Sequence, residues 1–134
     1  MWDINTTDLF DAWFEIQDER VREDVLAIIG ILSEDGPMLG RPFADSVRGS
    51  KHPNLKELRI QSRGDPFRAF FAFDPTRQGI ILCAGCKVGL NEEYFYKDMI
   101  AIADAEYSKH LLKTSKPVMP SRSAKPKKSS KKGK

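Results

Sequence analysis

Three strand-like segments follow one another closely in the middle of the chain, and they limit the possible folds more than any other feature. They cover residues 55–62, 67–73 and 79–86, and each is rich in β-branched or aromatic side chains or alternates in polarity. Turn residues at 64–66 and 74–79 separate them. Connections this short favour an antiparallel meander over parallel strands, which need long crossovers.

Helical patterns lie on both sides of this meander. After a short first strand at residues 1–5, capping residues at 6–8 precede a helix with one apolar stripe, and a second stripe runs from Val21 to Leu32 before Gly36 and Pro37 end it. Residues 38–54 are expected to form a loop, and residues 91–112 a closing helix. The predicted fold is therefore α+β, with two N-terminal helices, a small antiparallel sheet and a closing C-terminal helix.

Charge divides the chain into two parts. The whole sequence of 134 residues has a net charge of +3, but residues 107–134 contain ten Lys or Arg and no acidic residue. From residue 113 onward Lys, Ser and Pro dominate, and such a segment buries too little apolar surface to fold. We therefore expect a domain at residues 1–112 and a disordered basic tail at 113–134, which could bind a polyanion such as ribosomal RNA.

Several classes of protein are disfavoured. The longest apolar run, residues 25–32, is far shorter than the roughly 20 residues of a membrane-spanning helix, and the N-terminus has no secretory signal pattern. The only cysteines, Cys83 and Cys86, are too few for a disulfide scaffold, and their place in a strand argues against a metal site. These features predict a cytoplasmic protein with no membrane association, no metal and no cofactor.

Arg68 is the most informative single residue, because it interrupts the aromatic segment FRAFFAF. An arginine buried there needs an anionic partner. That partner is either an internal carboxylate such as Glu57 on the neighbouring strand or a phosphate group of a ligand. Lys87 follows the third strand in a glycine-flanked turn, and Tyr96 lies at the start of the closing helix, within reach of that turn.

Five segments together resemble the phage-derived HigB-like toxins of the RelE/ParE superfamily. The resemblance covers about residues 2–112 and is carried, in order, by LGRP at 39–42, GSKHPNLKELR at 49–59, FRAFFAFDP at 67–75, GCKVG at 85–89 and FYKDMI at 95–100. It implies the toxin of a type II toxin–antitoxin system, paired with a HigA-like helix-turn-helix antitoxin. Contact with operator DNA would then occur only through the antitoxin. The same resemblance implies a metal-independent endoribonuclease that cuts mRNA on the ribosome and so inhibits translation.

The resemblance also implies roles for individual residues. Arg68, Lys87 and Tyr96 correspond to catalytic positions, and Lys56 and Arg59 lie at or beside basic positions of the first strand of the meander, where they are expected to bind RNA or phosphate. Apart from the resemblance, His52 and Arg63 are also expected to bind RNA or phosphate, and His52 is a second candidate for the acid or base. Glu57 departs from the pattern, since a characterised relative has a catalytic lysine there. Two alternatives follow: a ParE-like toxin that inhibits gyrase by binding, and an RNA-binding remnant with weakened catalysis.

Overall fold

The computed structural model describes residues 1–115. These residues form a five-stranded sheet in the order β1-β5-β4-β3-β2, with helices on both faces. The elements, in chain order, are β1 (Ile4–Thr6), α1 (Asp8–Glu15), α2 (Glu19–Asp35), the short 3-10 helix η1 (Gly36–Met38), β2 (Ala44–Ser46), β3 (Lys56–Ser62), β4 (Asp65–Phe73), β5 (Gly79–Cys86) and α3 (Glu92–Ser115).

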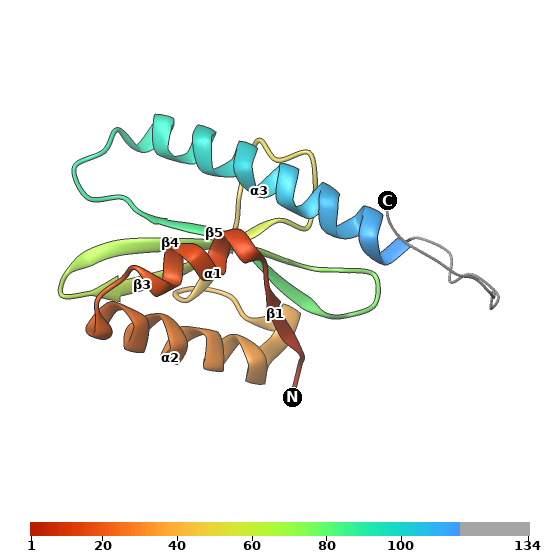
Figure 1. Cartoon of the computed structure of the whole chain (residues 1–134), viewed down its shortest axis with the longest axis horizontal. Helices are drawn as coiled ribbons and strands as arrows, with labels where there is room; N and C mark the ends of the chain where they lie inside the picture. The colour runs from red at the N-terminus through yellow and green to blue at the C-terminus, as the bar shows by residue number, and fades with distance from the viewer. Residues whose placement is uncertain (116–134) are drawn as a thin grey trace.

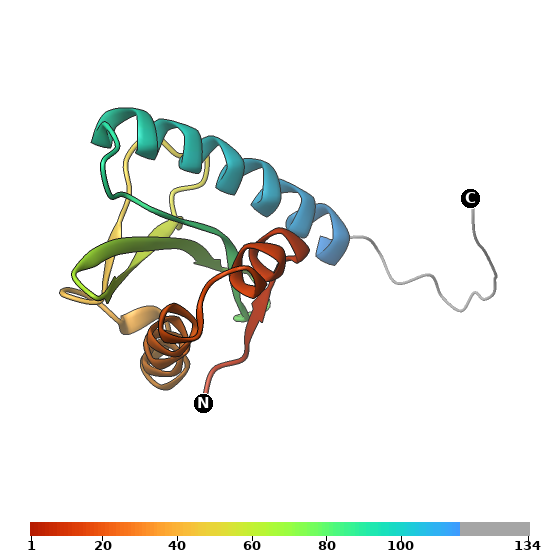
Figure 2. The same ribbon diagram turned by 60° about the vertical axis from the view of Figure 1, so that its left-hand side comes forward.

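The three central strands form the predicted antiparallel meander, in which β4 pairs with β3 on one side and with β5 on the other. α3 crosses one face of this sheet and α2 lies against the opposite face (Figure 1). The turned view separates the two layers more clearly (Figure 2). The predicted α+β architecture is confirmed.

The core is split by the sheet into two apolar clusters. On the α1 and α2 side the cluster includes Phe10, Val25 and Leu32, and on the α3 side it includes Phe70 and Phe95. Because successive residues of a strand point to opposite faces, β4 contributes to both clusters, whereas β3 gives its apolar residues Leu58 and Ile60 to the α2 side and two charged residues to the α3 side. A side chain on either strand is therefore committed to one helical layer by its position alone.

Local signals in the sequence account for the ends of both N-terminal helices. The Thr7 hydroxyl accepts the Phe10 amide at 3.0 Å, and an Asp18 carboxylate oxygen accepts the Val21 amide at 2.9 Å, so each helix begins with a side-chain cap. α2 ends at Gly36, whose φ of 66° favours glycine. A β-carbon at Gly36 would also collide with the Trp2 indole.

The structure differs from the sequence-based prediction at three places. β1 pairs in parallel with β5, so the sheet is mixed rather than purely antiparallel. β2 lies inside the expected loop at 38–54, because Ala44–Ser46 pairs with β3. α3 continues to Ser115, so residues 113–115, expected in the tail, are helical. The predicted disorder of residues 116–134 lies outside the described residues.

Candidate active site

Two arginines meet across the hairpin formed by β3 and β4. Arg59 and Arg68 are register partners on these strands, and both side chains lie on the face covered by α3. Glu57 lies two residues before Arg59 and therefore on the same face. Like charges directly opposite each other on paired strands are destabilising, so this pair needs an anionic neighbour.

Glu57 supplies that neighbour from a buried position, with only 4% of its side chain exposed. Its Oε2 accepts a hydrogen bond from Arg59 Nε at 2.9 Å, and its Oε1 accepts one from the Tyr96 hydroxyl at 2.6 Å. Arg68 Nε is 3.8 Å from the same Oε1. The internal carboxylate considered as the partner of Arg68 is therefore present, and it is shared between two arginines.

These contacts do not use all the hydrogen-bond donors of the Arg68 guanidinium group. Its Nε also donates to the Tyr96 hydroxyl at 3.3 Å, and its Nη1 donates to the Phe67 carbonyl at 3.0 Å. Within residues 1–115, its Nη2 has no hydrogen-bond partner. Because Glu57 also pairs with Arg59, at the shorter distance of 2.9 Å, it neutralises Arg68 only in part, and the Arg68 guanidinium keeps a free donor for an incoming anion.

Tyr96 joins α3 to the charged residues of the sheet. Burial, together with the hydrogen bond to Glu57, raises the pKa of Tyr96 to about 12. The phenol therefore remains protonated at neutral pH and can act as a proton donor. Lys87 Nζ lies 5.2 Å from the centre of the Tyr96 ring and 3.7 Å from Glu92 Oε2, so the ammonium group packs over the aromatic face.

The unexpected strand β2 extends this network. Asp45 Oδ2 accepts hydrogen bonds from Arg59 Nη2 at 3.2 Å and from Arg41 Nε at 3.0 Å. The hydrogen bond to Glu57 raises the pKa of Arg59, with further help from the Asp45 charge. Sequence reasoning missed Asp45 because the strand that positions it is only three residues long. For the pairing of Glu57 with Arg59, the sequence did offer a signal, because residues two apart in a strand lie on the same face.

Three residues expected to bind RNA lie elsewhere, and two of them are on or near the α2 side of the sheet. Lys56 points to the α2 face and donates to the Pro37 carbonyl at 3.2 Å. Arg63, at the β3–β4 turn, pairs with Asp18 at 3.3 Å. The structure thus brings together Arg59, Arg68, Lys87 and Tyr96 and separates them from Lys56 and Arg63.

His52, the third of these residues, lies in the segment between β2 and β3 and contacts α3 beyond Tyr96. Its Nε2 is 3.1 Å from the Ser108 hydroxyl, and its ring packs edge-on against Tyr107 at 4.7 Å. Ser108 follows Tyr96 by twelve residues of α3, which corresponds to about 18 Å along the helix axis. His52 is therefore not placed to exchange a proton with Tyr96.

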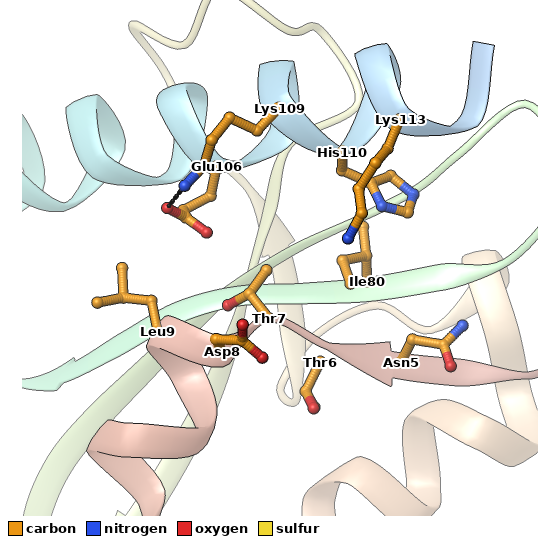
Figure 3. Close-up of a pocket in the computed structure, with 10 residues that line it drawn as sticks. All are labelled: Asn5, Thr6, Thr7, Asp8, Leu9, Ile80, Glu106, Lys109, His110 and Lys113. Atoms are coloured by element: carbon orange, nitrogen blue, oxygen red, sulfur yellow. Dashed lines mark ion pairs between the residues drawn. The ribbon is translucent and has the colours of Figure 1, made fainter. Parts of the chain in front are cut away.

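A second buried carboxylate, Asp74, directly follows β4 and contacts α3 near its C-terminal end. Its Oδ2 is 2.8 Å from His110 Nε2, and its Oδ1 accepts from the Thr76 amide and hydroxyl and from the Gln78 amide at 2.7–3.0 Å. His110 also borders a cavity of about 720 Å³ between α3 and the β1–α1 junction. In Figure 3, Lys109 and Lys113 of α3 face Thr7 and Asp8 across this cavity.

Other candidate chemistry is weaker. Burial raises the pKa of the Cys83 thiol to about 12, so it stays protonated and unreactive. Among residues 1–115, no three His, Cys, Asp or Glu side chains are grouped so as to hold a metal ion. No helix in this same part of the chain has the length and apolar character needed to span a bilayer.

The chain is similar to members of a known protein family. Residues 12–108 match the family described as "Phage derived protein Gp49-like (DUF891)". The Mycobacterium tuberculosis (strain ATCC 25618 / H37Rv) protein "Putative toxin HigB2" is 46% identical over 101 residues, covering 75% of this chain and 50% of that protein. "Putative toxin HigB3" from the same organism is 42% identical over 94 residues, covering 70% of this chain and 80% of that protein. The chain thus spans about half the length of HigB2.

Two solved structures share the fold at low sequence identity. A double arginine-to-alanine mutant of E. coli toxin RelE in the free state has a TM-score of 0.53 at 14% identity, covering 82% of this chain and 97% of that chain. A chain of the intact E. coli RelBE toxin–antitoxin complex has a TM-score of 0.50 at 13% identity, covering 63% and 95%. The chain belongs to the phage-derived Gp49-like family, is similar in sequence to two putative HigB toxins and shares the fold of RelE.

Proposed function

We propose that this protein is the toxin of a type II toxin–antitoxin system and that it cuts mRNA on the ribosome. Its HigB-like relatives and its RelE-like fold support the first part. The observation that carries the second part is the convergence of Arg59, Arg68 and Tyr96 on the buried Glu57. A site that only binds a protein partner has no need for a phenol, a carboxylate and two guanidinium groups within hydrogen-bond reach of one another.

The arrangement suits phosphodiester cleavage by the neighbouring 2′-hydroxyl. In this reaction the 2′-oxygen attacks phosphorus as the bond to the 5′-oxygen breaks, leaving a 2′,3′-cyclic phosphate and a 5′-hydroxyl. Arg68, with its free Nη2, binds the phosphate and stabilises the charge that develops on its oxygens, and Arg59 adds a second positive charge. Lys87, next to Tyr96, increases the positive potential at the phosphate.

Proton transfer falls to Glu57 and Tyr96. Glu57 accepts the proton of the 2′-hydroxyl, and Tyr96, whose pKa is raised to about 12, donates its proton to the departing 5′-oxygen. After the products leave, the 2.6 Å hydrogen bond provides a direct route for the proton on Glu57 to return to Tyr96. The cycle balances with these side chains alone, so the proposed mechanism requires no metal ion.

The proposed partners follow from this assignment. The substrate is mRNA bound to the ribosome in the cytoplasm, and the inhibitor is a HigA-like helix-turn-helix antitoxin. We propose that the toxin meets operator DNA only through this antitoxin. A partner that covers Arg59 and Arg68 would block phosphate binding, so we expect its contacting segment to be acidic.

Arg68→Ala tests the proposal most directly. Removal of one transition-state donor typically lowers the rate by about 10²–10³. Cleavage of a reporter mRNA by purified protein and ribosomes should fall by this factor, and cells expressing the variant without an antitoxin should grow. Arg20→Ala, which removes an exposed arginine of α2 paired with Asp24, is the matched control and should remain toxic. Growth arrest by a folded Arg68→Ala protein would contradict the nuclease and favour a gyrase-binding toxin.

A further inference from the structure

Three cations beside the site have no ionic partner. Arg48 and Lys51 are exposed in the segment between β2 and β3, and Lys97 is exposed on α3 directly after Tyr96. Within the part of the chain that the structure describes, none of the three lies within 4.0 Å of a carboxylate oxygen. By contrast, Arg59, Arg68 and Lys87 all have such partners.

These three cations border one groove. It has a volume of about 650 Å³ and runs between α3 and the β2–β3 segment, which reaches up to the helix in Figure 1. Its helical wall includes Ile100 and Ala101, so an apolar surface lies between the charged groups. Tyr96 lines the same groove, and therefore the groove adjoins the Glu57–Arg68 site.

A buried carboxylate holds the β2–β3 segment in place. Asp104 of α3, only 6% exposed, accepts hydrogen bonds from the Ser50 hydroxyl at 2.5 Å and from the Lys51 amide at 3.0 Å. The Ser50 hydroxyl in turn accepts the His52 amide at 2.9 Å. Lys51 is therefore fixed through its backbone, while its ammonium group is left for another partner.

The charge balance favours an anionic occupant. Besides Asp104, whose oxygens are engaged, the only carboxylate lining the groove within residues 1–115 is Glu93. Three cations thus outnumber two anions along a channel with an aromatic ring at one end. Proteins that bind single-stranded nucleic acids combine a positively charged groove for the backbone with aromatic side chains on which the bases stack.

We propose that this groove binds the nucleotide of the mRNA strand next to the cleaved phosphate, with Arg48, Lys51 and Lys97 contacting its backbone and the α3 wall contacting its base. This inference rests on the proposed nuclease function and specifies the path of the substrate. The strand leaves the site along α3 and over the β2–β3 segment. It does not pass over the β3–β4 turn, where Arg63 is already paired with Asp18.

The test compares two double variants of the full-length protein. Lys51→Ala/Lys97→Ala removes two groove cations, and Lys109→Ala/Lys113→Ala removes two lysines from the opposite end of α3. Because all four side chains are exposed, we expect both proteins to fold, which thermal unfolding will verify. The probe is a single-stranded RNA methylated at every 2′-oxygen, which lacks the nucleophile and cannot be cut. Its binding is followed by fluorescence anisotropy over a salt series.

The groove variant should bind this RNA roughly tenfold more weakly than the unchanged protein at low salt. The slope of its affinity against salt should be shallower by about 1.4, because each lysine–phosphate interaction contributes about 0.7 on single-stranded RNA. The control variant should bind within about twofold of the unchanged protein. On ribosomes, the groove variant should show a raised KM with kcat nearly unchanged, because its cations bind the strand without touching the reacting atoms.

Equal RNA affinity of the two double variants would overturn the groove assignment. If Arg68→Ala still abolishes cleavage in that case, the proposed nuclease function stands without the groove. If the unchanged protein fails to cut mRNA on ribosomes, the nuclease function itself fails. A groove variant that keeps its RNA affinity but is no longer neutralised by an acidic antitoxin would assign the groove to a protein partner and refute the inference.

Discussion

Glu57 and Asp74 are both buried carboxylates that hold α3 against the sheet, one near each end of the helix. Their partners differ in kind. Asp74, with none of its side chain exposed, accepts three hydrogen bonds from its own turn and a fourth interaction from His110. Glu57 has no local backbone donor among its partners, and it is held by Arg59, Arg68 and Tyr96 from three different elements.

This difference separates a structural carboxylate from a candidate catalytic one. Three of the four donors around Asp74 are fixed by the turn between β4 and β5, and its side chain is closed off from solvent. The donors around Glu57 are long side chains, and one of them, Arg59, is 36% exposed. Such side chains can turn toward an entering phosphate while Glu57 accepts a proton. Burial alone therefore does not distinguish a structural carboxylate from a catalytic one. The distinction depends on whether its hydrogen-bond donors belong to the local backbone or to side chains of distant elements.

Glu57→Gln should produce the largest change, because loss of a general base typically lowers the rate by about 10²–10⁴. The amide keeps the size of the side chain and can still accept the Tyr96 hydroxyl, but it cannot take a proton. Single-turnover cleavage of mRNA on ribosomes measures the effect. Cleavage at the full rate would remove Glu57 from the mechanism and make it a second structural carboxylate.

Asp74→Asn should affect stability instead. In asparagine an NH2 group replaces one of the two carboxylate oxygens. This donor then faces either His110 or the donors of the turn, so a buried polar group loses its hydrogen bond and the free energy of unfolding falls by about 1–3 kcal/mol. Chemical denaturation measures this change, with Asp65→Asn on the exposed start of β4 as the control. The folded Asp74→Asn protein should still cut mRNA at the normal rate. A loss of cleavage without a loss of stability would reverse the assignment of the two carboxylates.

Asp74 should contribute to the way in which the free energy of unfolding depends on pH in the acid range. Burial alone would raise the pKa of Asp74, but the hydrogen bonds from His110, Thr76 and Gln78 outweigh it and hold the pKa below its usual value. Its stabilising contribution is therefore complete above the unfolded pKa of about 3.9 and is lost as the pH falls through the lower folded pKa. The unfolding free energy of Asp74→Asn should decline less steeply than that of the unchanged protein in this range. Parallel curves would contradict the assignment.

The smallest expected effect concerns Tyr96 and is measured by the pH at which its phenol ionises. Because its pKa is raised to about 12, its phenolate absorbance should appear well above the ordinary pKa of about 10. The stability that this raised pKa contributes is present below about pH 10 and is lost as the pH rises toward 12. The difference between the absorbance titrations of the unchanged protein and Tyr96→Phe isolates this residue from Tyr94 and Tyr107. A transition near pH 10 would contradict both the burial of Tyr96 and its hydrogen bond to Glu57.

Resemblance to a toxin family, rather than residue patterns alone, selected the residues of the candidate site. It named Arg68, Lys87 and Tyr96 together, and the structure places them side by side. Their catalytic roles stay predictions. The resemblance treated Glu57 as a departure, because a characterised relative has a lysine there, whereas the residue pattern had already named Glu57 as a possible partner of Arg68. The contact of Glu57 with Tyr96 of α3 is visible only in the structure.

Local interactions are the part of this protein that the sequence determined by itself. The caps at Thr7 and Asp18, the helix end at Gly36, the bounds of β5 and the short turns of the meander all depend on residues within a few positions of one another. These signals need no knowledge of distant parts of the chain.

Tertiary structure decided what depends on pairing between distant segments. β1 joins β5 in parallel only because the chain returns to that edge some seventy residues later, and β2 exists only because β3 offers it hydrogen bonds. The direction of each side chain on β3 follows from its register, so Arg59 enters the site while neighbouring Lys56 faces α2. Hydrogen-bond partners that lie far apart in sequence carry no local signal, and for that reason the contact between Glu57 and Tyr96, the role of Asp45 and the groove beside α3 were found only in the folded chain.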